Sequence, residues 1–220
     1  MVRVTEAGQD TGATTAAGER ILAGLDLWAE WATATQRAIV GAALESFAER
    51  GFHGTSLKHI AQGSGLSTAA LYVHFASKEE LLFALSRRGH TIALELVRAA
   101  AAEPDPAAAM RVLVYSFTRW HAEQRTTARV VQYEQGALTA AHAEVVAELR
   151  RDTERVVRGV IDRGVEAGAV TVPDVRGAGA AVLSLGIDVA RWFVPDGPWT
   201  PDALGLLYAG LAGRMLGMPA

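Results

Sequence analysis

The stretch Ser56–Leu82, SLKHIAQGSGLSTAALYVHFASKEELL, constrains the fold most, because its pattern allows only short helices before a longer one. Thr55 or Ser56 can cap a first helix, and the G-S-G segment allows a tight turn. Ser67 can cap a second short helix, and S-K-E-E is a capping box that starts a long third helix. Two short helices joined by a glycine-containing turn and braced by a third predict a helix-turn-helix unit.

The rest of the chain repeats apolar residues at helical spacing and is rich in alanine, leucine and arginine, which predicts an all-α protein. We expect about nine helices, among them one from the S-x-x-E box to about 102, three over 105–123, 127–136 and 140–167, and two that start after the caps Asp174 and Thr200. The predicted domains are an N-terminal arm (1–32), a helix-turn-helix domain (33–88) and a C-terminal helical domain (89–220).

The first 19 residues are small and polar, which predicts a flexible arm. The segment ERILAGLDLWAEWA follows and predicts an optional extra helix, with apolar side chains near one face: Ile21, Leu22, Leu25, Trp28 and Trp31. Such a helix either packs on the body of the protein or belongs to a functional arm, and the sequence leaves both open.

Composition excludes several classes of function. The chain has no cysteine and therefore no disulfide, thiolate metal site or cysteine nucleophile. It lacks an apolar signal segment, a run long enough to span a membrane and the common nucleotide or zinc motifs, so we expect a soluble cytoplasmic protein without cofactor or bound metal. The net charge is −3, yet six basic and four acidic residues between Thr35 and His90 make that segment positive. This asymmetry supports a localised phosphate-contacting surface.

The second short helix has the character of a helix that enters the major groove of DNA. Its leading end, S-T-A-A, is bare, so its backbone can approach base edges. Tyr72 and His74 flank the inward seam of Leu71 and Phe75, and both can donate hydrogen bonds to phosphate. Lys78 lies in the first turn of the next helix, where a cation is unfavourable unless a phosphate shares the site. These features predict DNA as the partner.

The run from Phe47 to Leu82, FAERGFHGTSLKHIAQGSGLSTAALYVHFASKEELL, resembles the DNA-binding domain of TetR/AcrR-type transcriptional repressors. The shared pattern is F-x-x-x-G-[FY]-x-x-[TS]-[TS], I-A, G-[VL]-S and L-Y-x-[HY]-F-x-[SN]-K-[ED]. His59 departs from it, since an acidic residue is usual there. The resemblance implies DNA contacts from nine residues: Thr55, Ser56, Lys58 and Ser67 at the helix starts, Thr68, Ala69 and Tyr72 in the groove, and His74 and Lys78 on the backbone. Because Thr68 and Ala69 offer few hydrogen bonds, we expect base readout through thymine methyl groups and DNA shape.

The resemblance also implies a C-terminal domain that binds a small-molecule inducer and forms a homodimer. The last two helices are rich in glycine, alanine and leucine, which suits a four-helix dimer interface or, alternatively, packing within one chain. Candidate inducer contacts are aromatic and polar residues that could equally be core: Tyr115, Trp120, His121, Tyr133, Asp188 and Trp192.

The segments RWFVPDGPWTPDAL and HAEQRTTARVVQYE are similar to the branch of the family that senses acyl-CoA thioesters. This favours an apolar acid derivative or CoA thioester, with Arg125 or Arg129 near its anionic part. The alternatives are a multidrug-responsive repressor of an efflux pump, an activator in place of a repressor, or, with little support, a helical enzyme.

Overall fold

The structure is a computed structural model that describes the backbone of residues 4–31 and 33–219 and the side chains from residue 11 onward within those ranges. The described part of the chain contains no strand and is built of α1 (Val4–Ala23), α2 (Ala34–Gly54), α3 (Leu57–Gly63), α4 (Thr68–His74), α5 (Lys78–Ala101), α6 (Pro106–Glu123), α7 (Arg125–Tyr133), the 3₁₀ turn η1 (Gln135–Ala137), α8 (Ala140–Glu166), α9 (Val175–Trp192) and α10 (Pro201–Met215). None of these helices has the length and apolar content needed to cross a membrane. The all-α prediction is confirmed.

Side-chain caps start the helices where the sequence predicted them. Five caps accept hydrogen bonds from backbone N–H groups of the first turn, namely Ser56, Ser67, Asp105, Asp174 and Thr200. The predicted box before α5 is half formed. The hydroxyl of Ser77 accepts from the N–H of Glu80, but the Glu80 carboxylate accepts from the N–H of Ala76. Gly51, with φ 69° in the left-handed region that favours glycine, interrupts α2 with a kink.

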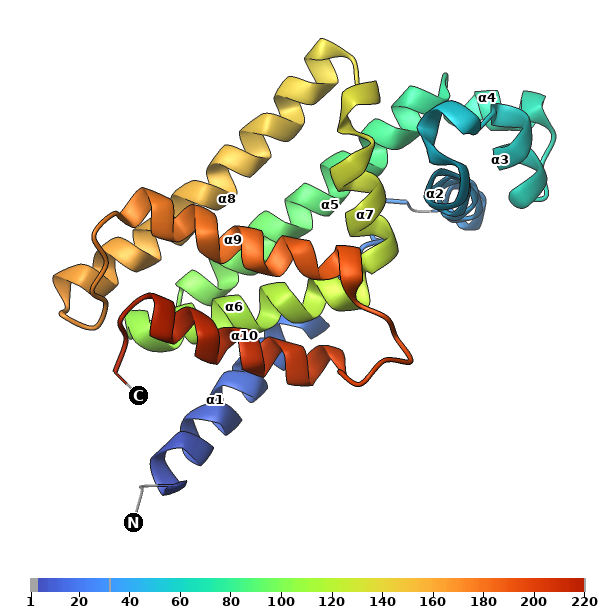
Figure 1. Cartoon of the computed structure of the whole chain (residues 1–220). Coiled ribbons are helices and arrows are strands. Elements are labelled where there is room, and N and C mark those ends of the chain that lie inside the picture. Colours follow the sequence, from blue (N-terminus) through green and yellow to red (C-terminus); the bar gives the residue numbers. More distant parts are fainter. Residues whose placement is uncertain (1–3, 32, 220) are drawn as a thin grey trace. The chain divides into compact units, whose positions relative to one another are not determined.

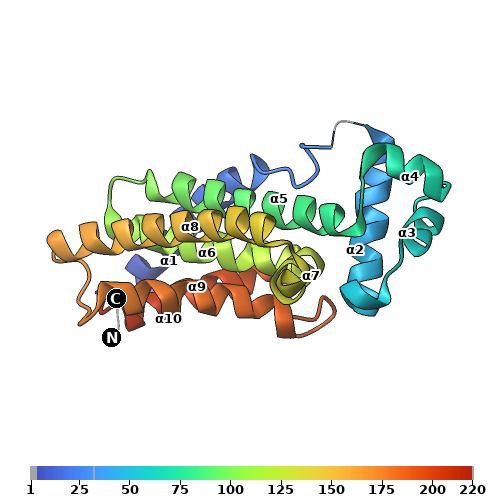
Figure 2. The ribbon, with the colours of Figure 1, turned by 90° about the horizontal axis from the view of Figure 1, so that it is seen from above.

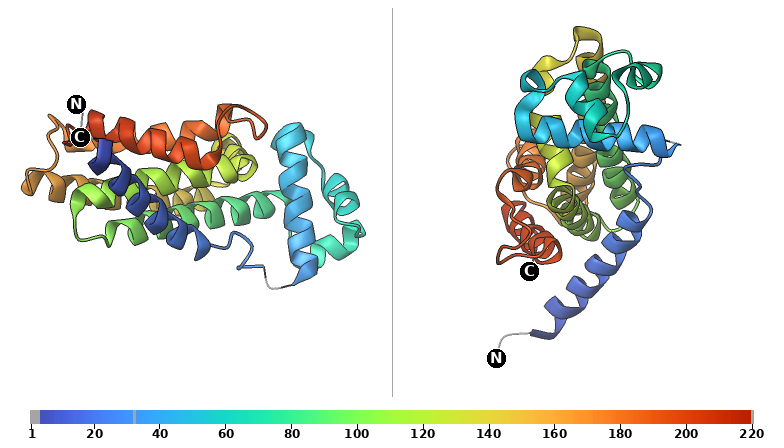
Figure 3. Two further views of the ribbon diagram at one scale, coloured as in Figure 1. Left: turned by 90° about the horizontal axis from the view of Figure 1, so that it is seen from below. Right: turned by 90° about the vertical axis from the view of Figure 1, so that its right-hand side faces the viewer.

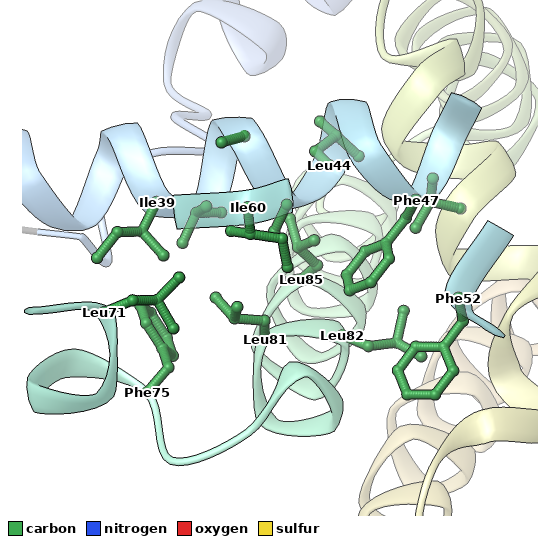
Figure 4. Close-up of a cluster of buried hydrophobic side chains, with 14 of the residues drawn as sticks. Ile39, Leu44, Phe47, Phe52, Ile60, Leu71, Phe75, Leu81, Leu82 and Leu85 are labelled. Atoms are coloured by element: carbon green, nitrogen blue, oxygen red, sulfur yellow. The ribbon is translucent and has the colours of Figure 1, made fainter. Parts of the chain in front are cut away.

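The chain divides into two compact units. One comprises residues 26–92 and 126–150 and is called the reading unit below. It contains α2, α3, α4, the first part of α5, α7 and the start of α8 (Figure 2). Its core joins α2, α3, α4 and α5 through buried aliphatic and aromatic side chains (Figure 4). Leu71 of α4 and Phe75, the C-cap of that helix, are buried in this core, as predicted.

The other unit comprises residues 1–25, 93–125 and 151–220 and is called the body unit below. Helix α6 is its centre, with α1, α9 and α10 packed against it (Figures 1 and 3). Tyr115 of α6 is fully buried, with Gly18 of α1 at one edge of its ring and Gly205 of α10 at the other. The absent Cβ atoms of these two glycines let three helices approach closely.

The N-terminal segment differs from the prediction. Residues 4–23 form α1, so the flexible arm is wrong for the described residues, while residues 1–3 lie outside them. The optional helix is also misplaced, because Trp28 and Trp31 lie in a turn after α1. Their rings are 5.6 Å apart, and Trp31 is buried in the core of the reading unit. Within residues 11–23 of α1, the buried residues are Thr14 and Gly18, which are too small or polar to give a hydrophobic period.

Candidate DNA-binding interface

The turn between α3 and α4 is held by backbone geometry. Gly65 has φ 72°, a left-handed conformation that favours glycine. The N–H of Leu66 donates to the carbonyl of Ala61 at 2.9 Å, and Leu66 packs against the core of the reading unit. Gly63 lies so close to α2 that a Cβ there would be 3.1 Å from the Cβ of Ala42. The turn therefore sets the position of α4 relative to α2 and α3.

Helix α4 presents its outward face to solvent. Ala69 and His74 are exposed, and Tyr72 and Val73 are 53% and 81% exposed. Thr68 is half-buried at the first position of the helix. The Ser67 hydroxyl is exposed but accepts the N–H of Ala70 at 3.1 Å, so its first role is to cap the helix.

The start of α3 carries the second group of predicted DNA contacts. Ser56 accepts the N–H of His59 at 3.2 Å, while the Nδ1 of His59 accepts the N–H of Ser56 at 3.3 Å. His59 therefore replaces the usual carboxylate of a capping box with an imidazole. Lys58 is exposed, and no acidic side chain in the described part of the chain pairs with it. Its ammonium is available to an anion.

Two residues predicted to contact phosphate, Thr55 and Lys78, form hydrogen bonds within the protein instead. Thr55 is only 2% exposed, and its hydroxyl lies within hydrogen-bond distance of the carbonyls of Ser46 and Gly51, to which it donates. The Nζ of Lys78 donates to the carbonyls of Phe52 and Thr55 at 2.7 and 2.8 Å and lies 4.2 Å from the centre of the Phe52 ring. The Thr55 hydroxyl is buried and already hydrogen-bonded, and the Lys78 ammonium already donates to the carbonyls of Phe52 and Thr55.

A contact that the sequence did not predict joins α5 to α8 within the reading unit. The Glu79 carboxylate accepts the N–H of Thr139 at 2.9 Å and lies 2.9 Å from the Nδ1 of His142. The His142 ring stacks on Phe83 with centroids 3.7 Å apart and planes 3° from parallel. These residues lie about 60 positions apart in sequence, and no local pattern links them.

Comparison with known proteins identifies this helix-turn-helix unit. Residues 39–85 match the family described as bacterial regulatory proteins, tetR family. Residues 103–216, more than half of the chain, match the family described as tetracyclin repressor-like, C-terminal domain. The chain belongs to the TetR family of transcriptional regulators. Helix α1 lies outside both matched segments.

Individual TetR-family proteins agree with this assignment. The chain is 39% identical over 79 residues to the HTH-type transcriptional regulator RutR of Escherichia coli, a match that spans 36% of the chain and 37% of RutR. It is 35% identical to a tetR-family regulatory protein from Rhodococcus RHA1, with a TM-score of 0.81 over 86% of this chain and all of the other. AibR in complex with isovaleryl coenzyme A and operator DNA is 22% identical, with a TM-score of 0.74 over 83% of this chain and 98% of AibR, and therefore shares the fold.

The predicted inducer contacts of this TetR-family chain differ in burial and in the unit to which they belong. Tyr133 is 61% exposed in the reading unit, whereas the other five residues belong to the body unit. Trp120 and His121 are buried and pack edge to face. Asp188, predicted as an inducer contact or a core residue, is exposed and forms an ion pair with Arg191 that lowers the pKa of its carboxyl. Trp192 is 38% exposed.

Tyr115, the remaining predicted contact, belongs to a polar network at the centre of the body unit. Its hydroxyl donates to Asp202 of α10 and accepts from Arg119 at 2.8 Å. Burial and the hydrogen bond to Asp202 raise the pKa of the Tyr115 phenol. Burial acts to lower the pKa of Arg119, but hydrogen bonds to Glu123 and Tyr115 raise it overall, so its charge is permanent. Glu19 of α1 lies 3.7 Å from Arg119 and extends the network to the N-terminal helix.

The body unit contains a cleft of about 680 Å³ under the last turns of α1. Ile21, Ala99 and Val112 contribute apolar surface from α1, α5 and α6, while Arg20 and Glu103 add charge. None of the predicted inducer contacts lines it. Its volume lies within the range of small-molecule sites.

Proposed function

We propose that the chain is a homodimeric transcriptional repressor that binds a pseudo-palindromic operator and leaves it when a small hydrophobic inducer binds. The observation that carries this proposal is the outward face of α4. Tyr72, Val73 and His74 are exposed there, although Leu71 and Phe75 hold the helix firmly to the core. Lys58 adds a free cation at the neighbouring helix, and cations that neutralise phosphates supply most of the affinity for DNA.

The apolar surface of α10 supports the dimer. Leu207, Leu211 and Met215 recur every four residues and are 38%, 40% and 41% exposed. Residues at this spacing share one face of a helix, so they form a continuous apolar stripe. A second copy of α9 and α10, related by a two-fold axis, would bury it in a four-helix arrangement. Such a dimer would present two α4 helices to half-sites about 34–36 Å apart.

For the inducer we propose an apolar carboxylic-acid derivative or CoA thioester, because AibR, which shares the fold, was solved with isovaleryl coenzyme A. The body unit is the proposed binding unit, and its cleft under α1 is the first site to probe. A hydrophobic cationic drug is the alternative ligand class. An inducer releases DNA only if it binds the non-DNA-binding state more tightly.

The decisive experiment is a gel shift with the DNA upstream of the protein's own gene, at several salt concentrations and with unrelated DNA as competitor. We expect sequence-selective binding by a species that sedimentation shows to be a dimer, and weaker binding by the Lys58→Ala variant. Arg155→Ala, which removes an exposed charge from α8, serves as the matched control and should bind as the unaltered protein does. Binding that shows no sequence preference at any salt concentration would reject the proposal.

The same assay tests the inducer class and the direction of regulation. Isovaleryl-CoA, free CoA and a hydrophobic cation are added separately to the preformed complex. Release by the thioester alone supports the proposed class, and release by the cation alone supports the multidrug alternative. In a reporter strain, deletion of the gene should raise expression from its operator, whereas a fall would identify an activator.

A further inference from the structure

Val73 is the most exposed of the large apolar side chains in the described part of the chain, at 81%, and it did not figure among the predicted DNA contacts. It follows Ala69 by one helical turn, so the two side chains share a face of α4. Tyr72 borders this face. The exposed face of α4 that contains Ala69 and Val73 is therefore apolar.

The composition of α4 limits what this face can recognise. The helix, TAALYVH, contains no arginine, lysine, glutamine, asparagine or carboxylate, which are the side chains that form paired hydrogen bonds with base edges. Its hydrogen-bonding groups are the half-buried Thr68 hydroxyl, the Tyr72 hydroxyl and the His74 ring. The Ala69–Val73 face can distinguish bases only by apolar contact, and the 5-methyl group of thymine is the apolar feature of the major groove.

We propose that Val73, together with Ala69, is a specificity-determining residue that reads thymine methyl groups at fixed positions of each half-site. This inference rests on the proposed function and specifies the operator that the protein recognises. DNA suits this surface better than an apolar protein partner because Lys58 is free on the neighbouring helix, His74 is exposed beside Val73, and residues 35–90 carry a net positive charge. Leu71 and Phe75 already anchor α4, so the core does not need Val73.

The test removes the methyl groups of each partner separately, namely the 5-methyl group of thymine and the two γ-methyl groups of Val73. After operator selection from random DNA, each thymine in the half-site is replaced by deoxyuridine, which lacks only the methyl group. Burying one methyl group is worth a factor of about four in affinity, so one or two positions should weaken binding about fourfold, or about fifteenfold when both half-sites are changed. The Val73→Ala variant should bind the thymine and deoxyuridine operators equally at the position that Val73 reads.

Val194→Ala, which truncates a 59% exposed valine in the body unit, is the matched control and should keep the full sensitivity to deoxyuridine. The salt dependence of binding should be the same for the unaltered protein and Val73→Ala, since no phosphate contact changes. Thermal unfolding should also be unchanged, because Val73 is exposed.

The outcomes separate this inference from the proposed function. Sequence-selective binding that no deoxyuridine substitution weakens overturns the role of Val73 and leaves the repressor intact. Additive losses from Val73→Ala and deoxyuridine at every position overturn it as well, because the two groups then act independently. A protein that selects no operator at all fails the proposed function, and the inference falls with it.

Discussion

Replacement of Gly18 by alanine tests whether α1 is an integral part of the body unit. A Cβ at this position would lie 2.4 Å from two ring carbons of Tyr115 and 2.8 Å from the Ser116 hydroxyl, far inside the 3.5–4.0 Å of normal carbon contacts. The ring cannot retreat, because Gly205 closes its other edge and Asp202 holds its hydroxyl. Either α1 or the α6–α10 packing must shift.

Two opposing effects set the size of the change. Alanine in a helix is favoured over glycine by about 0.5–1 kcal/mol, and overpacking a filled interior costs about 1–3 kcal/mol. Gly12→Ala provides the control in the same helix, since its Cβ would meet nothing within 4 Å. Gly12→Ala should therefore gain only the stability that comes from the higher helix propensity of alanine. The difference in stability between Gly12→Ala and Gly18→Ala then gives the packing cost, about 1–3 kcal/mol.

Amide hydrogen exchange of α1 and of α6 measures this difference directly. Protection of residues 11–23 should fall in Gly18→Ala relative to Gly12→Ala by about five- to a hundredfold, at roughly tenfold per 1.4 kcal/mol. If the substitution only undocks α1, α6 keeps its protection. If the packing around Tyr115 yields as well, the midpoint of urea unfolding falls too. Equal protection in the two variants would refute the close contact between Gly18 and Tyr115.

Four further variants test other parts of the chain. Lys78→Ala should destabilise the reading unit by about 1–3 kcal/mol in urea, because the Thr55 carbonyl loses the ammonium donor and the Phe52 carbonyl keeps only the N–H of Thr55. It should leave the salt slope of DNA binding unchanged. Lys58→Ala should do the reverse and lower that slope by about one, and an exchange of the two results would restore Lys78 as a phosphate ligand. Burial lowers the pKa of His90 from 6.5. The charge of Arg150 adds to this shift, and a hydrogen bond to the Ser86 carbonyl opposes it. The unfolded chain therefore binds the proton first, so stability is lost as the pH falls below about 6.5. His90→Gln should reduce the difference between unfolding midpoints at pH 7.5 and 5.5, and an unreduced difference would contradict the assignment. Leu211→Asp should convert the proposed dimer to monomers in sedimentation without loss of helical circular dichroism, whereas an intact dimer would place the interface elsewhere.

The sequence predicts those features whose partners lie within a few residues. Ser67 caps α4 because its hydroxyl meets the N–H of Ala70, three positions later, and Asp105 caps α6 in the same way. Leu71 and Phe75 are four residues apart and must share the inward face of a helix. The fold class and the helix-turn-helix unit follow from such local relations alone.

Contacts between distant segments could not be predicted in this way. The Lys78 ammonium meets carbonyls 26 and 23 residues earlier, and the turn that brings them together involves the kink at Gly51. From sequence the same lysine is a cation misplaced at a helix start, which suggests a missing phosphate. Helix α1 packs through Gly18, whose lack of a side chain is the reason for the close contact and also the reason that no hydrophobic period marks it.

The division of the chain implies how a signal from the body unit can reach the DNA-reading helices. The chain crosses from one unit to the other inside two continuous helices, between residues 92 and 93 of α5 and between residues 150 and 151 of α8. Within the reading unit, Glu79 and Phe83 join the start of α5 to His142 of α8. A displacement of α8 must therefore act on the first turn of α5.

That first turn also contains Lys78, whose ammonium holds the carbonyls of Phe52 and Thr55 between α2 and α3. The path from α8 to the helix-turn-helix thus consists of polar and stacking contacts joined through the first turns of α5, all within one compact unit. Because such contacts transmit a shift only if they persist in both states, a His142→Ala variant should uncouple inducer binding from operator release while each binding event persists separately. Retained coupling in that variant, measured as the inducer-dependent change in operator affinity, would assign the transmission to another contact.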